Sequence, residues 1–367
     1  MKEIKSTMKK VLAIAFAAMM SVSLFGCTVF FGDNGSTTSS SSSSSSSKKP
    51  GISVGGDSSS IGIVNKNEFN MNDFVSYAAP LAEDTTDYST KSGYDIIIQA
   101  GQSNAEGSGY GDADNPFEPN DDILYYADSY QSTNTVLDGN FKVMQAAEKS
   151  TVVGKRGDFS LSFATEYLYS DFFYPNVGRK VLIIRAGVGG TGFSDKRWTP
   201  DGDWYLRMMA AIDSALKLEY GDGEHRLVAF LWHQGETDAM NGVTENKYYE
   251  YLSTLLTSVR TTYECPTLPF FCADFVQDWR STTPTASDRI NNASKRVCQD
   301  FAPGAFLTTY GLISNKQDPT HPTQASDIVN DNIHFCRNSL NLLGQKYFTA
   351  YQKLMTDCMA LENNQAE

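Results

Sequence analysis

The clearest pattern in the chain is a series of short, continuous apolar runs that begins near residue 94. Apolar runs without polar alternation are typical of strands that are buried on both faces of a sheet. Between the runs, apolar residues recur at helical spacing. Alternating buried strands and helices predict a three-layer α/β/α sandwich with a central, mostly parallel sheet of the flavodoxin-like kind. The predicted strands cover 96–98, 181–184, 227–232, 268–271 and 305–307, and the predicted helices cover 161–168, 206–216, 248–259 and 338–354.

The first 27 residues have the composition of a lipoprotein signal peptide. Lysines precede the apolar run 11–20, which is too short to span a bilayer comfortably. The run leads into Leu24-Phe25-Gly26-Cys27, which resembles a bacterial lipobox, where the cysteine is acylated after cleavage. We therefore expect an extracytoplasmic protein that is anchored to the cell-envelope membrane through a lipid on Cys27. If Cys27 is not acylated, the same segment is a plain secretory signal.

Composition divides the rest of the chain. Residues 28–60 are rich in serine and include nine consecutive serines, from Ser39 to Ser47. Such a segment cannot bury apolar surface, so we predict a disordered linker. Residues 61–92 are mixed and polar and are interpreted as an N-terminal extension, and 93–357 form the predicted globular domain.

The net charge and the histidine and cysteine spacing argue against nucleic-acid binding and metal binding. The chain has 43 Asp and Glu residues against 30 Lys and Arg, a formal net charge of −13. Nucleic-acid binding needs a basic patch, and no Lys/Arg cluster is apparent, so neutral substrates fit better than polyanionic ones. The four histidines lack zinc-site spacing, and no C-x-x-C occurs. We therefore expect no metal, no cofactor and no nucleic-acid partner.

Polar, glycine-bearing loops follow three of the predicted strands. They are residues 101–104, 187–191 and 233–238. Ligands of parallel sheets bind beyond the carboxyl ends of the strands, so we expect the three loops to face one crevice.

The first loop contains a candidate nucleophile. Ser103 follows Gly101, which permits a sharp turn after the strand. Helix capping is the alternative role for a serine at this position. Main-chain N–H groups of Ser103 and of the Gly189-Gly190 loop, together with the side-chain amide of Gln234, are candidate donors to an oxyanion.

Two Asp-x-x-His pairs compete as the base and its orienting acid. They are Asp318 with His321 and Asp331 with His334. The second pair leads into the apolar final helix, and residues held by a rigid element make better catalysts. We therefore favour His334 with Asp331.

Four sequence blocks in this order resemble the SGNH hydrolase superfamily. More narrowly, they resemble its branch of sialate O-acetylesterases and the acetylxylan esterases of carbohydrate esterase family six. The blocks are Gly101-Gln102-Ser103-Asn104, Gly189-Gly190-Thr191, His233-Gln234-Gly235-Glu236 and Asp331-x-x-His334.

The resemblance implies roles for single residues. Ser103 is the nucleophile and His334 the general base. Asp331 is the third member of the triad, with Glu236 as the alternative. The oxyanion hole consists of Ser103, a glycine of the second block (Gly190, with Gly189 as the second choice) and Gln234.

The implied activity is that of an exported carbohydrate O-acetylesterase. It would act without a cofactor on acetylated xylan-type or sialic-acid glycans. An esterase for non-carbohydrate esters and a non-catalytic glycan-binding lipoprotein are the alternatives.

Overall fold

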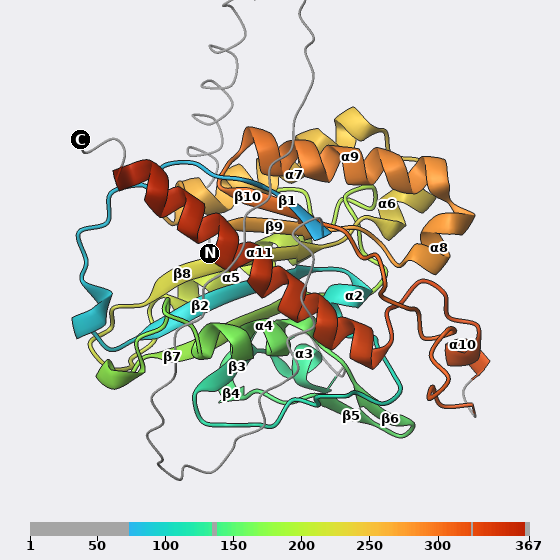
Figure 1. The fold of residues 1–367 in the computed structure, drawn as a ribbon, viewed down its shortest axis with the longest axis horizontal. Helices are drawn as coiled ribbons and strands as arrows, with labels where there is room; N and C mark the ends of the chain where they lie inside the picture. The colour runs from blue at the N-terminus through green and yellow to red at the C-terminus, as the bar shows by residue number, and fades with distance from the viewer. Residues whose placement is uncertain (1–72, 134–137, 324–325, 364–367) are drawn as a thin grey trace, which may run out of the picture. The chain divides into compact units, whose positions relative to one another are not determined.

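The computed structural model describes residues 73–133, 138–323 and 326–363, and Figure 1 shows their fold. The predicted signal peptide, Cys27, the linker and the first part of the predicted extension lie outside these residues. The remaining part of that extension, 73–92, belongs to the same compact unit as the predicted domain.

A central sheet of eight strands organises the described part of the chain. Its order is β1-β10-β9-β8-β2-β7-β3-β4. The inner strands from β10 to β3 are parallel, while β1 and β4 pair antiparallel at the two edges. The strands are β1 (Phe74–Tyr77), β2 (Tyr94–Gly101), β3 (Ile123–Ala127), β4 (Lys142–Gln145), β7 (Lys180–Gly187), β8 (Arg226–His233), β9 (Phe270–Ala273) and β10 (Gly304–Leu307). A separate hairpin pairs β5 (Lys149–Thr151) with β6 (Gly154–Arg156).

Helices cover both faces of the sheet, as Figure 1 shows with α11 and α4 in front of the strands. Successive residues of a strand point to opposite faces. In β8, Trp232 Nε1 donates to the Tyr248 hydroxyl of α7, whereas His233 Nδ1 lies 3.4 Å from the Tyr347 hydroxyl of α11. The two helices therefore lie on opposite faces, and the predicted three-layer α/β/α sandwich is confirmed. The longer helices are α4 (Phe159–Leu168), α5 (Asp203–Ala215), α7 (Glu245–Thr262), α9 (Pro284–Asp300) and α11 (Arg337–Asn363), and the shorter ones are α2 (Ser103–Glu106), α3 (Ser129–Thr133), α6 (Glu236–Met240), α8 (Gln277–Thr282) and α10 (Ser326–Val329).

Four of the five predicted strands lie within β2, β7, β8 and β10, and the fifth, 268–271, overlaps β9, which begins two residues later. The four predicted helices correspond to α4, α5, α7 and α11. The sequence pattern did not predict β1, β3 or α9. In α9 the buried face includes Ser287, Asn291 and Ser294, so few large apolar residues mark this helix in the sequence. Within the described residues, no helix is long and apolar enough to cross a membrane. The cysteines of the same residues are free thiols: Cys265, Cys272, Cys298, Cys336 and Cys358.

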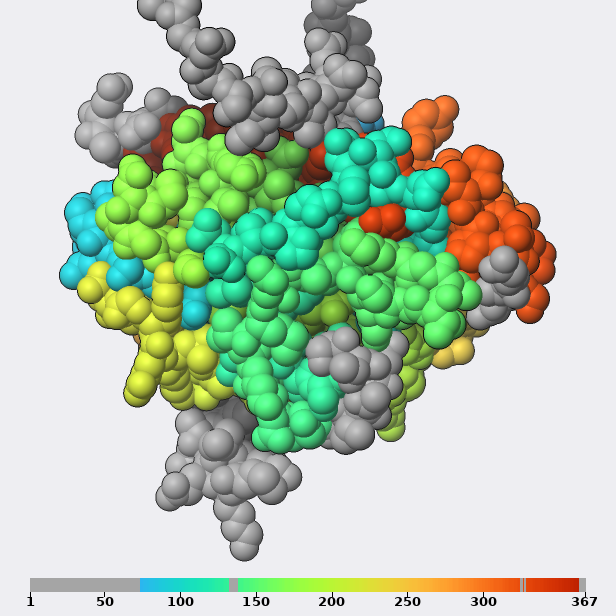
Figure 2. Space-filling view, turned by 90° about the horizontal axis from the view of Figure 1, so that it is seen from below, coloured from blue at the N-terminus to red at the C-terminus, as the bar shows by residue number. Residues whose placement is uncertain are grey.

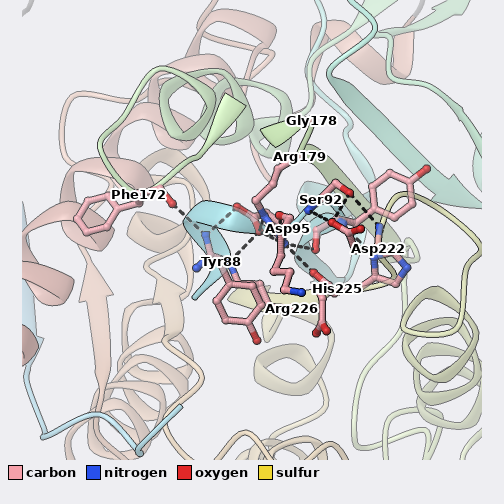
Figure 3. A network of polar contacts seen from close by, with 12 residues as sticks. Tyr88, Ser92, Asp95, Phe172, Gly178, Arg179, Asp222, His225 and Arg226 are labelled. Atoms are coloured by element: carbon pink, nitrogen blue, oxygen red, sulfur yellow. Dashed lines mark hydrogen bonds and ion pairs between the residues drawn. The ribbon is translucent and has the colours of Figure 1, made fainter. Parts of the chain in front are cut away.

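A buried carboxylate joins the amino ends of the three central strands (Figure 3). Asp95 of β2 forms ion pairs with Arg179, just before β7, and with Arg226, the first residue of β8, both at 2.7 Å. The Tyr167 hydroxyl of α4 donates to the same carboxylate at 2.8 Å. The side chains of Asp95 and Arg179 are fully buried, so each charge needs the opposite charge beside it to offset the cost of its burial.

We predict that Asp95→Asn lowers the free energy of unfolding by about 3–5 kcal/mol, because it leaves Arg179 as an uncompensated buried charge. Urea denaturation followed by circular dichroism measures the change. Asp213→Asn is the control, because it breaks an exposed pair with Lys217 and should change stability by less than about 1 kcal/mol. Equal effects of the two substitutions would contradict the structural role of Asp95.

Candidate active site

The nucleophile candidate lies in a tight turn after the central strand. Ser103 is the first residue of α2, two residues beyond the end of β2 at Gly101. Gly101 has a φ of +137°, and a Cβ atom there would lie 2.0 Å from the carbonyl oxygen of His233. Only glycine fits this position, so β2 and β8 approach closely enough to bring their following loops together.

The structure brings Ser103, His334 and Asp331 into one hydrogen-bonded relay. Ser103 Oγ lies 2.7 Å from His334 Nε2, and His334 Nδ1 lies 2.8 Å from Asp331 Oδ2. These distances suit proton transfer from the serine hydroxyl to the imidazole, with the carboxylate orienting the ring.

Asp331 is held in its ionised form. Its Oδ1 accepts the main-chain N–H groups of Ile333 and His334, and its Oδ2 also accepts Asn315 Nδ2 at 2.9 Å. Burial tends to raise the pKa of Asp331, but the hydrogen bonds, led by that of His334, outweigh it and lower the pKa below its usual value. A charged carboxylate is therefore present to stabilise an imidazolium.

Glu236, the alternative third member, occupies a different position. It is fully buried, its Oε1 accepts Asn104 Nδ2 at 2.8 Å, and its Oε2 has no partner among the described residues. Burial raises its pKa. Asn104 Oδ1 in turn accepts the Phe335 N–H. Glu236 thus contacts the His334 segment through Asn104, whereas Asp331 contacts the imidazole itself.

The main-chain N–H groups predicted to stabilise the oxyanion differ in whether they already donate a hydrogen bond. Gly189 lies beside Ser103, because a Cβ built on it would be 3.5 Å from Ser103 Cβ, but its N–H donates to Glu106 Oε2 at 2.8 Å. The N–H groups of Ser103 and Gly190 have no hydrogen-bond partner within the described residues. The N–H groups of Ser103 and Gly190 are therefore free to donate, whereas that of Gly189 is already bound.

Gln234 is buried and fully engaged. Its Nε2 lies 2.8 Å from Asp238 Oδ2 and 3.2 Å from both Gln102 Oε1 and the Thr191 carbonyl. Three acceptors surround the two hydrogens of this amide, so none is left for an oxyanion in this arrangement. These contacts join the loops after β7 and β8, and the donor role of Gln234 stays a prediction.

The other candidate side chains lie away from this relay. His225 bonds the Tyr94 N–H, His233 is buried, and His321 lies against the Asp318 carbonyl. Burial lowers the pKa of His233 to about 3, which keeps it neutral. Within the described ranges, no cluster of His, Cys, Asp and Glu can hold a metal ion.

Sequence reasoning missed the supporting contribution of Asn315. Asn315 connects Asp331 to the nucleophile loop, because its Oδ1 accepts the Tyr110 N–H and its Nδ2 donates to the Ser108 carbonyl. Asp238 accepts the N–H groups of Phe193 and Ser194 at the far side. A single asparagine outside the four blocks cannot be recognised as functional from one sequence.

We predict that Asp331→Asn slows covalent labelling of Ser103 by a fluorophosphonate by about 10³-fold or more, since the imidazole loses its orienting charge. Glu236→Gln is the matched amide substitution; it keeps an acceptor for Asn104 and should slow labelling by less than about tenfold. Mass spectrometry of the labelled serine gives both rates. The reverse ranking would make Glu236 the residue that supports the base.

Comparison with known proteins identifies a family that this chain matches. A family model described as "Carbohydrate esterase, sialic acid-specific acetylesterase" matches residues 93–353. No curated protein matches the chain significantly. The solved structure of NanS superposes with a TM-score of 0.58 at 16% identity, over 73% of this chain and 99% of NanS. A protein from Arabidopsis thaliana gives 0.51 at 19% identity, over 71% and 98%.

At these identities the two structures show a shared fold, while the family match covers most of the chain. The chain therefore belongs to the carbohydrate esterase family of sialic acid-specific acetylesterases and is a serine ester hydrolase.

Proposed function

We propose that this protein is an exported carbohydrate O-acetylesterase that hydrolyses acetyl esters on xylan-type or sialic-acid glycans through an acyl-serine intermediate. The main support for this proposal is the relay of Ser103, His334 and Asp331. The serine hydroxyl lies 2.7 Å from the imidazole and the imidazole lies 2.8 Å from the carboxylate, which is the order that acyl transfer requires. The family match directs the proposal to acetylated carbohydrate.

The first half of the reaction transfers the acetyl group to the enzyme. His334 Nε2 takes the proton of Ser103 Oγ as this oxygen attacks the ester carbonyl. The N–H groups of Ser103 and Gly190 stabilise the resulting oxyanion. His334 then protonates the departing sugar oxygen, and the acetyl group stays on Ser103.

The second half releases acetate. His334 takes a proton from water, which attacks the acetyl-serine, and then returns a proton to Ser103 Oγ. Asp331 stays ionised throughout, which agrees with its lowered pKa and stabilises the imidazolium in both halves.

We predict that Ser103→Ala reduces acetate release from acetylated xylan and from O-acetylated sialic acid by at least about 10⁴-fold, because the nucleophile is lost. The comparison uses the wild type, Ser103→Ala and Ser281→Ala, an exposed serine of α8 that should leave the rate unchanged. Acetate release that survives Ser103→Ala, or a folded wild type that is inactive on both substrates, would refute the proposal.

Lipid anchoring through Cys27 is part of the same proposal and is supported by the signal-like sequence that precedes this cysteine. We expect Cys27→Ser to move the protein from the membrane fraction to the soluble exported fraction of expressing bacterial cells, because a thioether-linked lipid can no longer form. Immunoblots of the two fractions measure the distribution. An unchanged distribution would mean that Cys27 carries no anchor.

A further inference from the structure

The carboxylate of Glu106 contacts the loop after β7 (residues 187–191, here the oxyanion loop) beside the nucleophile. Glu106 is the last residue of α2, three residues after Ser103. Its Oε2 accepts the N–H of Gly189 at 2.8 Å. A Cβ atom built on Gly189 would lie 3.1 Å from this oxygen and 3.5 Å from Ser103 Cβ. The carboxylate and the serine are therefore neighbours of the same glycine.

The oxyanion loop has buried ends and an exposed middle. The N–H of Val188 donates to the last carbonyl of β2 at 3.0 Å, and Thr191 Oγ1 donates to the Val188 carbonyl at 2.7 Å. Val188 and Thr191 are buried, whereas Gly189 and Gly190 are exposed. Among the described residues, Glu106 makes the only hydrogen bond to either glycine. Glycine has the widest conformational freedom of all residues, so this bond restrains the exposed pair.

The main chain of Glu106 is itself held in place. Its N–H donates to the Gln102 carbonyl at 2.8 Å, and its carbonyl accepts Arg185 Nη2 at 2.6 Å. Arg185 is buried in β7, and its Nη1 donates to the Gln131 carbonyl at 2.8 Å. Gln131 Nε2 in turn donates to the Gly187 carbonyl at 2.6 Å. Glu106 is thus connected to the strand from which the oxyanion loop departs.

The crevice near the catalytic base is open at the surface. In Figure 2, orange-red atoms of the region near residue 330 are visible in a hollow between teal atoms of the region near 115 and green atoms of the region near 150. Ser103, Glu106 and His334 are each partly exposed. Oxyanion donors act best when they are fixed before the reaction begins. An exposed glycine pair in contact with water therefore needs an acceptor that holds it.

The orientation of Gly189 determines where the N–H of Gly190 points. This N–H belongs to the peptide group that joins the two glycines, so it turns when Gly189 turns. Gly190 has a φ of +71°, which favours glycine, and its N–H has no partner within the described residues. With the Gly189 N–H bound to Glu106, the Gly190 N–H is the one of this pair that remains to bind an oxyanion.

We propose that Glu106 is a positioning residue for the oxyanion hole, which holds the Gly189 N–H so that the Gly190 N–H points at the oxyanion formed on Ser103. This inference rests on the acyl-serine mechanism of the proposed function. The hydrogen bond and not the charge performs this role, because a negative charge beside a developing oxyanion opposes its formation. Glu106→Gln, which keeps an oxygen acceptor without the charge, should therefore replace Glu106.

The kinetic test follows hydrolysis of p-nitrophenyl acetate by the full-length wild type, Glu106→Ala and Glu106→Gln. Glu106→Ala should lower kcat by at least about tenfold, because loss of a well-placed oxyanion donor slows the reaction. Its KM should change by less than about threefold, since the oxyanion exists only after the attack. Glu106→Gln should keep kcat within about threefold of the wild type, because the acceptor for Gly189 remains.

Glu118→Ala is the matched control, since Glu118 is an exposed glutamate in the segment before β3. It should leave kcat and KM unchanged. Glu106→Met, which keeps the side-chain length without an oxygen acceptor, takes the place of Glu106→Ala if the shorter side chain prevents folding. A kcat in Glu106→Gln as low as in Glu106→Ala would assign the effect to the charge and overturn the proposal. An unchanged kcat in Glu106→Ala, or an equal loss in Glu118→Ala, would also overturn it.

Labelling of Ser103 by a fluorophosphonate separates this inference from the proposed function. The reaction needs the nucleophile and the oxyanion hole but no acetylated sugar. Glu106→Ala should be labelled at least about tenfold more slowly than the wild type, and Glu106→Gln at close to the wild-type rate. If this ranking holds while no acetate is released from glycans, only the proposed function fails. Equal rates in the three proteins, or a wild type that is not labelled, overturn the role of Glu106 whatever the glycan assay gives.

Discussion

The site depends on the parallel register of β2 with its two neighbours. Gly101 at the end of β2 is the partner of Gly187 in β7 and of His233 in β8. The three strands therefore end at the same level, and the loops after them meet. At the opposite end, Asp95 binds Arg179 and Arg226 and so fixes the same three strands. A slip of one residue would exchange the faces of a strand and separate the nucleophile from its oxyanion donors.

Two neutral side-chain amides connect the segments of the site that the strand register brings close together. Asn104 joins the nucleophile turn to both Glu236 and the Phe335 N–H, and Asn315 joins Asp331 to Tyr110 and Ser108. These bonds fix the His334 segment against a turn more than 200 residues earlier in the chain. Buried amides hold a reactive group in place without adding a charge that would compete for the histidine proton.

Charge is distributed unevenly over the molecule. Asp95 forms an ion pair, whereas Asp331 and Asp238 each accept hydrogen bonds from two main-chain N–H groups. The Lys149–Arg156 pair is the opposite case, two cations in register that form no ion pair within the described residues.

The sequence by itself determined the fold class, the family and the order of the polar loops. Continuous apolar runs report burial on both faces, and this local property suffices to find β2, β7 and β8. It did not find α9, where the polar residues Ser287, Asn291 and Ser294 take up part of the buried face.

Only the tertiary structure decided which side chains meet. It placed Asp331 rather than Glu236 against His334, occupied the amide of Gln234 with Asp238, and set Lys149 opposite Arg156. The physical reason is that spacing along a chain reports which face a residue lies on. Hydrogen-bond partners drawn from segments as far apart as Ser103 and His334 depend on how those segments pack in three dimensions.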